Sequence, residues 1–273
     1  LMPLDFFSAD HALYDRPQGI PLLNRDSPQA QGLVGWWPLS RAADARDYSG
    51  FNRHGSFQNG AVLAPVPEIG YGLRTTASTA DNDHISVPDF TLTLGDFTCI
   101  VWFIDYSVAT SFERLVDKSF DLGFWLGRNG TTSNSWGGGV REGTTPFGRF
   151  VTLEDGKLHQ IVSRRQGTTH TIIGDGGQVS TSGTVTAQLL STASLLFGIQ
   201  ASGLGADLTD GFVADIKMYD WAVPDPIIEH SFAPDTRWDL YWQPRIMVPG
   251  FVAAAGVAGR RLMNTPLNFG FMR

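Results

Sequence analysis

The stretch Gly32–Leu39 reads GLVGWWPL, and the polar segment Asp47–Gly55, DYSGFNRHG, follows it closely. The first stretch is a short apolar run with two tryptophans, which is typical of a β-strand. The second combines Asp, Ser, Asn and Gly, the residues that favour tight turns. Together they predict the opening of a β-sandwich. Sandwiches of this kind usually serve as binding or structural modules and not as enzymes. The pattern therefore favours these two classes of function before any catalytic motif is considered.

The composition of the chain bounds its size class and its partners. Of 273 residues, 42% are hydrophobic and 17% are charged, which suits one large all-β domain with extensions or two small domains. The net charge of −7 and the lack of a Lys/Arg cluster argue against a nucleic-acid partner. No apolar run reaches the roughly 18–20 residues that span a bilayer, so we expect no membrane partner. Leu1–Phe7 lacks the regions of a secretory signal, and Cys99 is expected to be a buried free thiol.

Strand-like runs recur from Gly32 to about Ala233 at the spacing of a sandwich. The one expected helix is Asp225–Phe232, because Pro226 stands in its first turn. The Gly-, Ser- and Asn-rich segment Gly127–Gly148 favours a hairpin or loop region. The later runs of β-forming residues are Val87–Leu92, Asp96–Ile104, Arg114–Val116, Gly123–Gly127, Trp136–Glu142, Arg149–Leu153, Leu158–Arg164, His170–Ile173, Val179–Ser182, Ala193–Ile199 and Gly211–Tyr219.

The predicted organisation is an N-terminal arm over residues 1–31, a sandwich over 32–233 and a C-terminal arm over 234–273. Four prolines interrupt the first arm, and the end of the second is rich in Gly and Ala. Arms of this kind need a surface to become ordered, which is either their own domain or a neighbouring subunit.

Several short motifs follow one another in a recognisable order after GLVGWWPL and DYSGFNRHG. They are DHISVP at Asp83–Pro88, LGDFTCIVW at Leu94–Trp102, LEDGKLHQIV at Leu153–Val162, DGG at Asp175–Gly177 and GFVADIKMYD at Gly211–Asp220. This order resembles the laminin-G-like, concanavalin A-like jelly rolls, including the pentraxins, over roughly residues 32–232. The resemblance implies an all-β fold, a two-sheet antiparallel jelly-roll sandwich flanked by the extended arms.

Two expectations about packing accompany this resemblance. Trp36, Trp102 and Phe97 would alternate into the core of the sandwich. Gly156 would allow the chain to turn tightly before the strand that begins at Leu158.

A calcium site is the first candidate. Asp81, Asn82 and Asp83 resemble the short acidic turn that supplies calcium ligands in pentraxin-like members, and calcium prefers six to eight oxygen ligands. The remaining ligands would come from Asp207 and Asp210 in a later loop. The alternative is an Asx turn in which the side chains of Asp81 and Asn82 bond their own backbone.

A carbohydrate site is the second candidate. Trp125 and Trp136 flank the Gly/Asn-rich segment, which also holds Asn134, and sugars stack on exposed aromatic rings beside such loops. The alternative is that both tryptophans fill the core, where most large aromatic side chains lie.

Catalysis has no matching motif. Polysaccharide-cleaving sandwiches carry paired carboxylates spaced as Glu-x-Asp-x-x-Glu, and no such spacing occurs in this chain. The six histidines form no metal-binding pattern, and no Gly-x-Ser-x-Gly elbow is present. We therefore expect a protein that is not an enzyme.

The C-terminal arm holds the candidate interface residues Trp238, Tyr241, Trp242 and Arg245, since aromatic residues and Arg dominate protein interfaces. The alternative is that this arm folds back and covers an edge of its own sandwich. The segment Leu240–Arg245 also resembles the tail of laminin-G-like domains in phage structural proteins.

Two functional hypotheses follow. The first is a structural protein of a tailed-phage virion (a capsid decoration, fibre or tail component), assembled in the host cytoplasm. Its arms would contact other virion proteins and further copies of itself, and its loops could touch host glycans. The second is an extracellular carbohydrate-binding adhesion module, with or without help from calcium.

Overall fold

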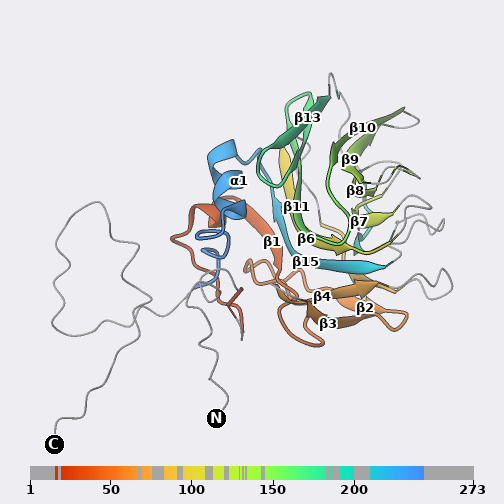
Figure 1. Ribbon diagram of the computed structural model, residues 1–273. Helices are drawn as coiled ribbons and strands as arrows, with labels where there is room; N and C mark the ends of the chain where they lie inside the picture. The colour runs from red at the N-terminus through yellow and green to blue at the C-terminus, as the bar shows by residue number, and fades with distance from the viewer. Residues whose placement is uncertain are drawn as a thin grey trace, which may run out of the picture. The chain divides into compact units, whose positions relative to one another are not determined.

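Two antiparallel sheets packed face to face form the sandwich in this computed structural model (Figure 1). The structure describes residues 16–17, 20–66, 69–75, 83–90, 95–107, 113–119, 123–128, 130, 132, 134–142, 145–182, 185, 191–199 and 210–242. Within this part of the chain, the first sheet has eight strands and the second has seven. The predicted all-β, two-sheet antiparallel jelly roll is confirmed.

The first sheet has the strand order β13-β12-β11-β6-β15-β4-β3, and β1 also pairs with β15. Its strands are β1 (Leu33–Trp37), β3 (Val62–Val66), β4 (Gly70–Thr75), β6 (Phe97–Asp105), β11 (Leu158–Gln166), β12 (Thr169–Gly174), β13 (Gln178–Ser182) and β15 (Gly211–Tyr219). The second sheet has the order β10-β9-β8-β7-β14-β5-β2. Its strands are β2 (Ser56–Gln58), β5 (His84–Val87), β7 (Arg114–Asp117), β8 (Phe124–Arg128), β9 (Ser135–Glu142), β10 (Thr145–Thr152) and β14 (Leu195–Phe197).

Some elements agree with the sequence pattern and others differ. β15 and the helix α1 (Asp225–Phe232) have the predicted bounds. The pattern predicts a strand over Val87–Leu92, whereas β5 ends at Val87, because the following Pro88 has no N–H for the ladder. The short strands β2, β3 and β4 are not indicated by the pattern. No helix in the described part of the chain is both long and apolar enough for a membrane crossing.

The Gly/Asn-rich segment contains strands where a loop was an alternative. β9 and β10 pair in register from Ser135 opposite Thr152 to Glu142 opposite Thr145. Gly138 lies in this hairpin with its α-carbon so close to Trp125 and Leu126 that a Cβ would overlap them. Glycine here allows neighbouring strands to pack closely. A Gly-rich composition alone does not distinguish this role from that of a loop.

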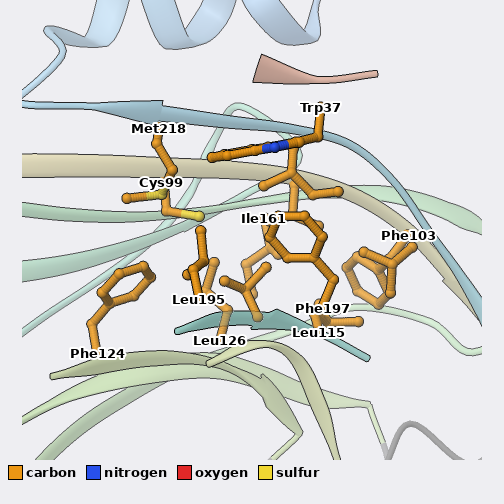
Figure 2. Packing of buried hydrophobic residues seen from close by; sticks show 14 of the residues in the cluster. Trp37, Cys99, Phe103, Leu115, Phe124, Leu126, Ile161, Leu195, Phe197 and Met218 are labelled. Carbon is orange, nitrogen blue, oxygen red and sulfur yellow. The ribbon is translucent and has the colours of Figure 1, made fainter. Parts of the chain in front are cut away.

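The space between the two sheets is filled by a fully apolar inner core (Figure 2). Trp37 from β1 packs edge-on against Phe197 from β14, with their ring centroids 5.3 Å apart. Phe97 lies in this core, as expected. Cys99 is also fully buried there as a free thiol, and burial raises the pKa of that thiol well above its usual range, so it is a packing residue.

A second apolar cluster, the outer cluster, covers the opposite face of the first sheet beneath α1 and the terminal segments (Figure 1). Trp36 and Trp102 belong to it, which corrects the expectation that they point into the space between the sheets. Neighbouring residues on a strand face opposite sides, so Trp37 enters the inner core and Trp36 the outer cluster. Other members are Tyr219, Val223, Ile228, Trp238, Leu240 and Tyr241.

The described parts of both predicted arms pair with each other on this outer face. Leu23 forms a β-bridge with Tyr241, and the Asn24 N–H donates to the Leu240 carbonyl at 2.8 Å. The Gln29 side chain donates to the Thr236 carbonyl at 3.0 Å. One compact unit runs over Leu1–Trp242 and a second over Gln243–Arg273. Residues 234–242 thus belong to the sandwich unit, beyond the predicted boundary at 233.

Candidate functional site

The strands pair antiparallel throughout, so their connections lie at the two ends of the sandwich, and one of these ends holds several of the predicted site residues. Asp105 at the end of β6 lies across from Gly211 at the start of β15, and Phe197 at the end of β14 lies across from Ile85 in β5. An ion pair from Asp105 to Arg128 joins the ends of β6 and β8 between the sheets. We call this region the loop end. Its described residues are 59–61, 83, 106–107, 113, 130, 132, 134, 153–157, 175–177, 198–199 and 210.

The fold brings three of the predicted site residues to the loop end. Asp83 is half-buried, and its Oδ1 would lie 3.4 Å from a Cβ on Gly60. Asp210 is exposed, and its carbonyl accepts a hydrogen bond from the Tyr106 N–H at 2.8 Å. Asn134 is half-buried and has a left-handed backbone, with φ of 58°. Asp81, Asn82 and Asp207 lie outside the described residues.

The predicted calcium site is not assembled by the described residues alone. In that part of the chain, no three His, Cys, Asp or Glu side chains group as ligands for a metal ion. Asp83 and Asp210 are two of the five predicted ligands, and calcium requires more oxygen ligands than these two supply. The calcium site stays a prediction that depends on the other three.

Asn134 has a structural task in addition to its place at the loop end. Its Oδ1 accepts from the Asp155 N–H at 3.3 Å, and its carbonyl accepts from the Leu153 N–H at 2.9 Å. Both contacts hold the turn between β10 and β11 in place. These contacts give Asn134 a structural role in this turn that requires no bound sugar.

The two tryptophans predicted to bind sugar are buried. Trp136 is fully buried in the inner core, where its ring centroid lies 4.4 Å from that of Phe103. Trp125 is only 5% exposed and carries the Arg114 guanidinium 4.1 Å from its ring centroid. A stacked sugar needs an exposed ring face. Trp136 therefore cannot stack on a sugar as predicted, and little of the Trp125 ring is accessible to one.

A cluster of buried charges, the Arg128 hub, lies at the loop end. The Arg128 Nε lies 3.1 Å from Glu113 Oε2, and its Nη2 lies 3.1 Å from Asp155 Oδ1 and pairs with Asp105. The Ser107 hydroxyl donates to Glu113 Oε1 at 2.8 Å. Arg128, Glu113 and Asp105 are almost completely buried, so these charges depend on each other in place of water.

The hub ties the strand connections together. Its members come from the ends of β6 and β8, the residue before β7 and the turn before β11, which are far apart in the sequence. The guanidinium also lies 4.9 Å from the Trp136 ring centroid, which connects the hub to the inner core. A rigid base of this kind keeps loop side chains in place for a ligand. No spacing in the sequence indicates it, because its residues meet only through strand pairing and the packing of the two sheets.

Tyr106 is the exposed aromatic residue that sequence reasoning missed at the loop end. Its side chain is 48% exposed and contacts Phe212 edge-on, with ring centroids 6.3 Å apart. Its backbone N–H bonds to Asp210, so an open ring and an exposed acidic residue are close in the fold. The available signal was its position directly after a dense buried strand, where the chain reaches the surface.

The predicted interface residues divide into buried and exposed positions. Trp238 and Tyr241 are buried in the outer cluster, and the Tyr241 hydroxyl donates to Asp215 Oδ1 at 3.2 Å. These two side chains therefore cover their own sandwich, the alternative expected for the arm. Trp242 is 49% exposed and remains accessible to a partner. Arg245 lies outside the described residues.

A family model described as the concanavalin A-like lectin/glucanases superfamily matches residues 79–228. Domain 4 of AbnA, a GH43 extracellular arabinanase from Geobacillus stearothermophilus, has a similar structure in its complex with arabinotriose. The TM-score is 0.60 at 13% identity, over 74% of this chain and 98% of that domain. No curated protein matches the chain in sequence.

The binding domain of one botulinum neurotoxin and a chain of another are also similar in structure. That of botulinum neurotoxin serotype D/C has a TM-score of 0.61 at 12% identity, over 75% of this chain and 52% of that one. A structure of botulinum neurotoxin type C, which depends on interaction with two ganglioside molecules to enter cells, gives 0.57 at 11%, over 74% and 51%. This chain spans about half the length of these toxin chains. At such identities the likeness shows the fold alone.

Proposed function

The chain belongs to the concanavalin A-like lectin/glucanase superfamily, and we propose that it is a non-enzymatic carbohydrate-binding module whose site lies at the loop end. The observation that carries this proposal is the exposed ring of Tyr106 beside Asp210, at the same end of the sandwich as the buried Arg128 hub. An aromatic face receives the C–H face of a sugar, and polar side chains around it receive the hydroxyl groups. The arabinotriose bound to the arabinanase domain and the gangliosides of the neurotoxin support this ligand class by analogy.

Binding is proposed in preference to cleavage because of where the carboxylates lie. A glycosidase needs two carboxyl groups that flank the bond in an open site, roughly 5–9.5 Å apart. At the loop end, Asp105 and Glu113 are buried and paired with Arg128, and Asp155 shares the same guanidinium. The buried carboxylates of Asp105 and Glu113 neutralise a cation in this arrangement and are not presented to a substrate.

The test is a glycan array followed by calorimetric titration of the strongest ligand. We expect the Tyr106→Ala protein to lose most of its affinity for that ligand, because the stacking face is removed. Trp242→Ala is the matched control, since Trp242 is about equally exposed and lies outside the loop end, next to the bridge between Leu23 and Tyr241. Retention of full affinity by Tyr106→Ala, or an array without any bound glycan, would refute the proposal. Titration with calcium in the same experiment, on wild type and Asp83→Ala, tests the metal prediction.

A second candidate function is an assembly role, including the structural role in a tailed-phage virion. The observation in its favour is an exposed apolar strip formed by Ile20, Leu22 and Trp242, in which the Trp242 N–H donates to the Leu22 carbonyl at 2.6 Å. Exposed apolar patches mark interaction surfaces. Light scattering on the full chain and on residues 1–242 would test it, since an assembly role predicts an oligomer that depends on the C-terminal segment. A monomer in both forms would count against it.

A further inference from the structure

Arg53 lies against two phenyl rings at the end of the sandwich opposite the loop end. Its Cζ is 4.9 Å from the ring centroid of Phe51 and 4.3 Å from that of Phe90. Phe90 follows the end of β5, a strand that begins at the loop end, so the two regions are separated by the length of the sheet. Phe51 is 54% exposed, whereas Phe90 is almost buried. The guanidinium therefore contacts one buried ring, that of Phe90, and one solvent-accessible ring, that of Phe51.

The backbone around Arg53 is held firmly. Its N–H donates to Asp47 Oδ2 at 3.0 Å, and its carbonyl accepts from the Trp37 indole N–H at 2.8 Å. The side chain donates through Nη1 to the Val34 carbonyl. Because one of the five guanidinium N–H groups makes this bond within the described residues, the arginine is oriented and still has donors for a ligand.

The charges near Arg53 leave it cationic. Burial lowers the pKa of the guanidinium, and the carboxylates of Asp47 and Asp220 oppose this shift without reversing it. The carboxylate of Asp47 accepts hydrogen bonds from backbone N–H groups, including those of Trp36 at 2.9 Å and Ser49 at 2.8 Å. Partial removal from water strengthens the attraction between a guanidinium and an anion.

Lys118 is another cation near this cluster, and it already has two hydrogen-bond partners. Its Nζ bonds to Asp89 at 2.6 Å and to the Ala193 carbonyl at 3.0 Å, and it lies 4.9 Å from the Phe90 ring centroid. Lys118 therefore helps to position Phe90 behind the guanidinium. Among the cations that contact the Phe90 ring in the described structure, Arg53 is the one that also contacts the exposed Phe51 ring.

We propose that Arg53 and Phe51 form a second sugar site, which recognises the carboxylate of an acidic sugar. A planar guanidinium binds a carboxylate through two parallel hydrogen bonds, which an ammonium group cannot reproduce. The exposed Phe51 ring lies beside it, where the C–H face of the same sugar ring can stack. This site rests on the proposed sugar-binding function but uses none of the loop-end residues, so the two proposals can fail separately.

The experiment compares pairs of sugars that differ in one carboxylate, namely glucuronide with glucoside and sialyllactose with lactose. We expect the wild-type protein to bind the acidic member of a pair more tightly. Arg53→Lys and Phe51→Ala should each reduce affinity for the acidic sugar by about tenfold or more, and leave the neutral sugar unaffected. Arg46→Lys is the control for a nearby arginine, whose side chain is 66% exposed.

Each outcome decides the proposal. Equal binding of acidic and neutral sugars by the wild type would overturn it, and so would full retention of the preference in Phe51→Ala, which keeps the arginine and its charge. If inorganic phosphate competes as well as the acidic sugar, Arg53 is a general anion site and the sugar assignment is wrong. If Tyr106→Ala loses all sugar binding and the wild type shows no preference for acidic sugars, the loop-end proposal is supported and only the Arg53 proposal is refuted.

Discussion

Arg128 Nε lies 3.1 Å from Glu113 Oε2, and both side chains are fully buried at the loop end. Asp105 and Asp155 contact the same guanidinium, so this single cation holds three carboxylates together in the described structure. A buried charge that loses its partner is costly, because water cannot replace the contact. The stability of the loop end is therefore expected to depend on Arg128 more than on any exposed ion pair.

Arg128→Met should lower the free energy of unfolding by about 3–5 kcal/mol, because it leaves buried carboxylates unpaired. Urea denaturation of the variant and the wild type measures the difference. Lys157→Met is the control, since its ion pair with Glu154 is well exposed and should matter little. Equal losses in the two variants would show that the hub is not a stabilising element.

Two glycines at the loop end allow a matched comparison. Gly156 has φ of +79° and open space where a Cβ would lie, with no neighbouring atom within 4 Å, whereas Gly198 has φ of +88° with Leu73 and Thr75 atoms at 3.1 Å from that position. Gly156→Ala should cost about 1–2 kcal/mol from the left-handed backbone alone. Gly198→Ala should cost more, since steric contact adds to the same strain. Thermal unfolding of both variants tests the order, and a smaller loss for Gly198→Ala would contradict it.

His170 should make the protein less stable in acid. It is fully buried with Nε2 2.9 Å from the Ser163 hydroxyl, and burial lowers its pKa to about 3, with Arg165 and Arg149 acting in the same direction. The unfolded chain takes up this proton near pH 6.5, so stability is complete above that pH and falls as the pH drops towards 3. The slope for one proton is about 1.4 kcal/mol per pH unit.

Urea denaturation at pH 7.5, 6 and 5 should show this dependence in the wild type and a shallower one in His170→Gln. The variant loses packing at every pH, but the gap between the two proteins should narrow as the pH falls. A constant gap would mean that His170 is protonated equally in the folded and unfolded states.

His159 should act with the opposite sign. Burial lowers its pKa, but the bond from Nδ1 to Asp175 at 2.7 Å, the charge of Asp175 and the Glu154 carbonyl outweigh burial, so the net shift is upward. Its contribution to stability is present below the unfolded pKa, near 6.5, and is lost as the pH rises through the folded pKa. His159→Gln should therefore cost more stability at pH 5.5 than at pH 8.5. A larger loss at the higher pH would contradict the assignment.

Trp238→Ala should destabilise the sandwich by about 3–5 kcal/mol, as expected when a large buried aromatic side chain is removed. Its ring centroid lies 5.7 Å from that of Trp102 and 6.0 Å from that of Tyr241, so the change opens the outer cluster. Trp242→Ala, at a half-exposed position next to the same segment, should have a small effect. Chemical denaturation of the two variants separates a covering role for the 234–242 segment from a role in contacts between molecules alone.

The amino-acid sequence by itself determined the all-β class, the two-sheet sandwich and the position of the short helix. Local periodicity and turn chemistry decide these features, which is why β15 and α1 have their predicted bounds. The buried state of Cys99 could be predicted for the same reason, because it stands in a dense apolar strand.

Only the tertiary structure decided which face each aromatic residue occupies and which polar residues meet. Strand alternation separates Trp36 from Trp37, but the sequence does not show that α1 and the terminal segments cover the outer face. The Arg128 hub joins the ends of strands from both sheets, and these ends meet only when the two sheets pack face to face. Exposure of Tyr106 and burial of Trp136 follow from this packing, because accessibility depends on neighbours contributed by other strands.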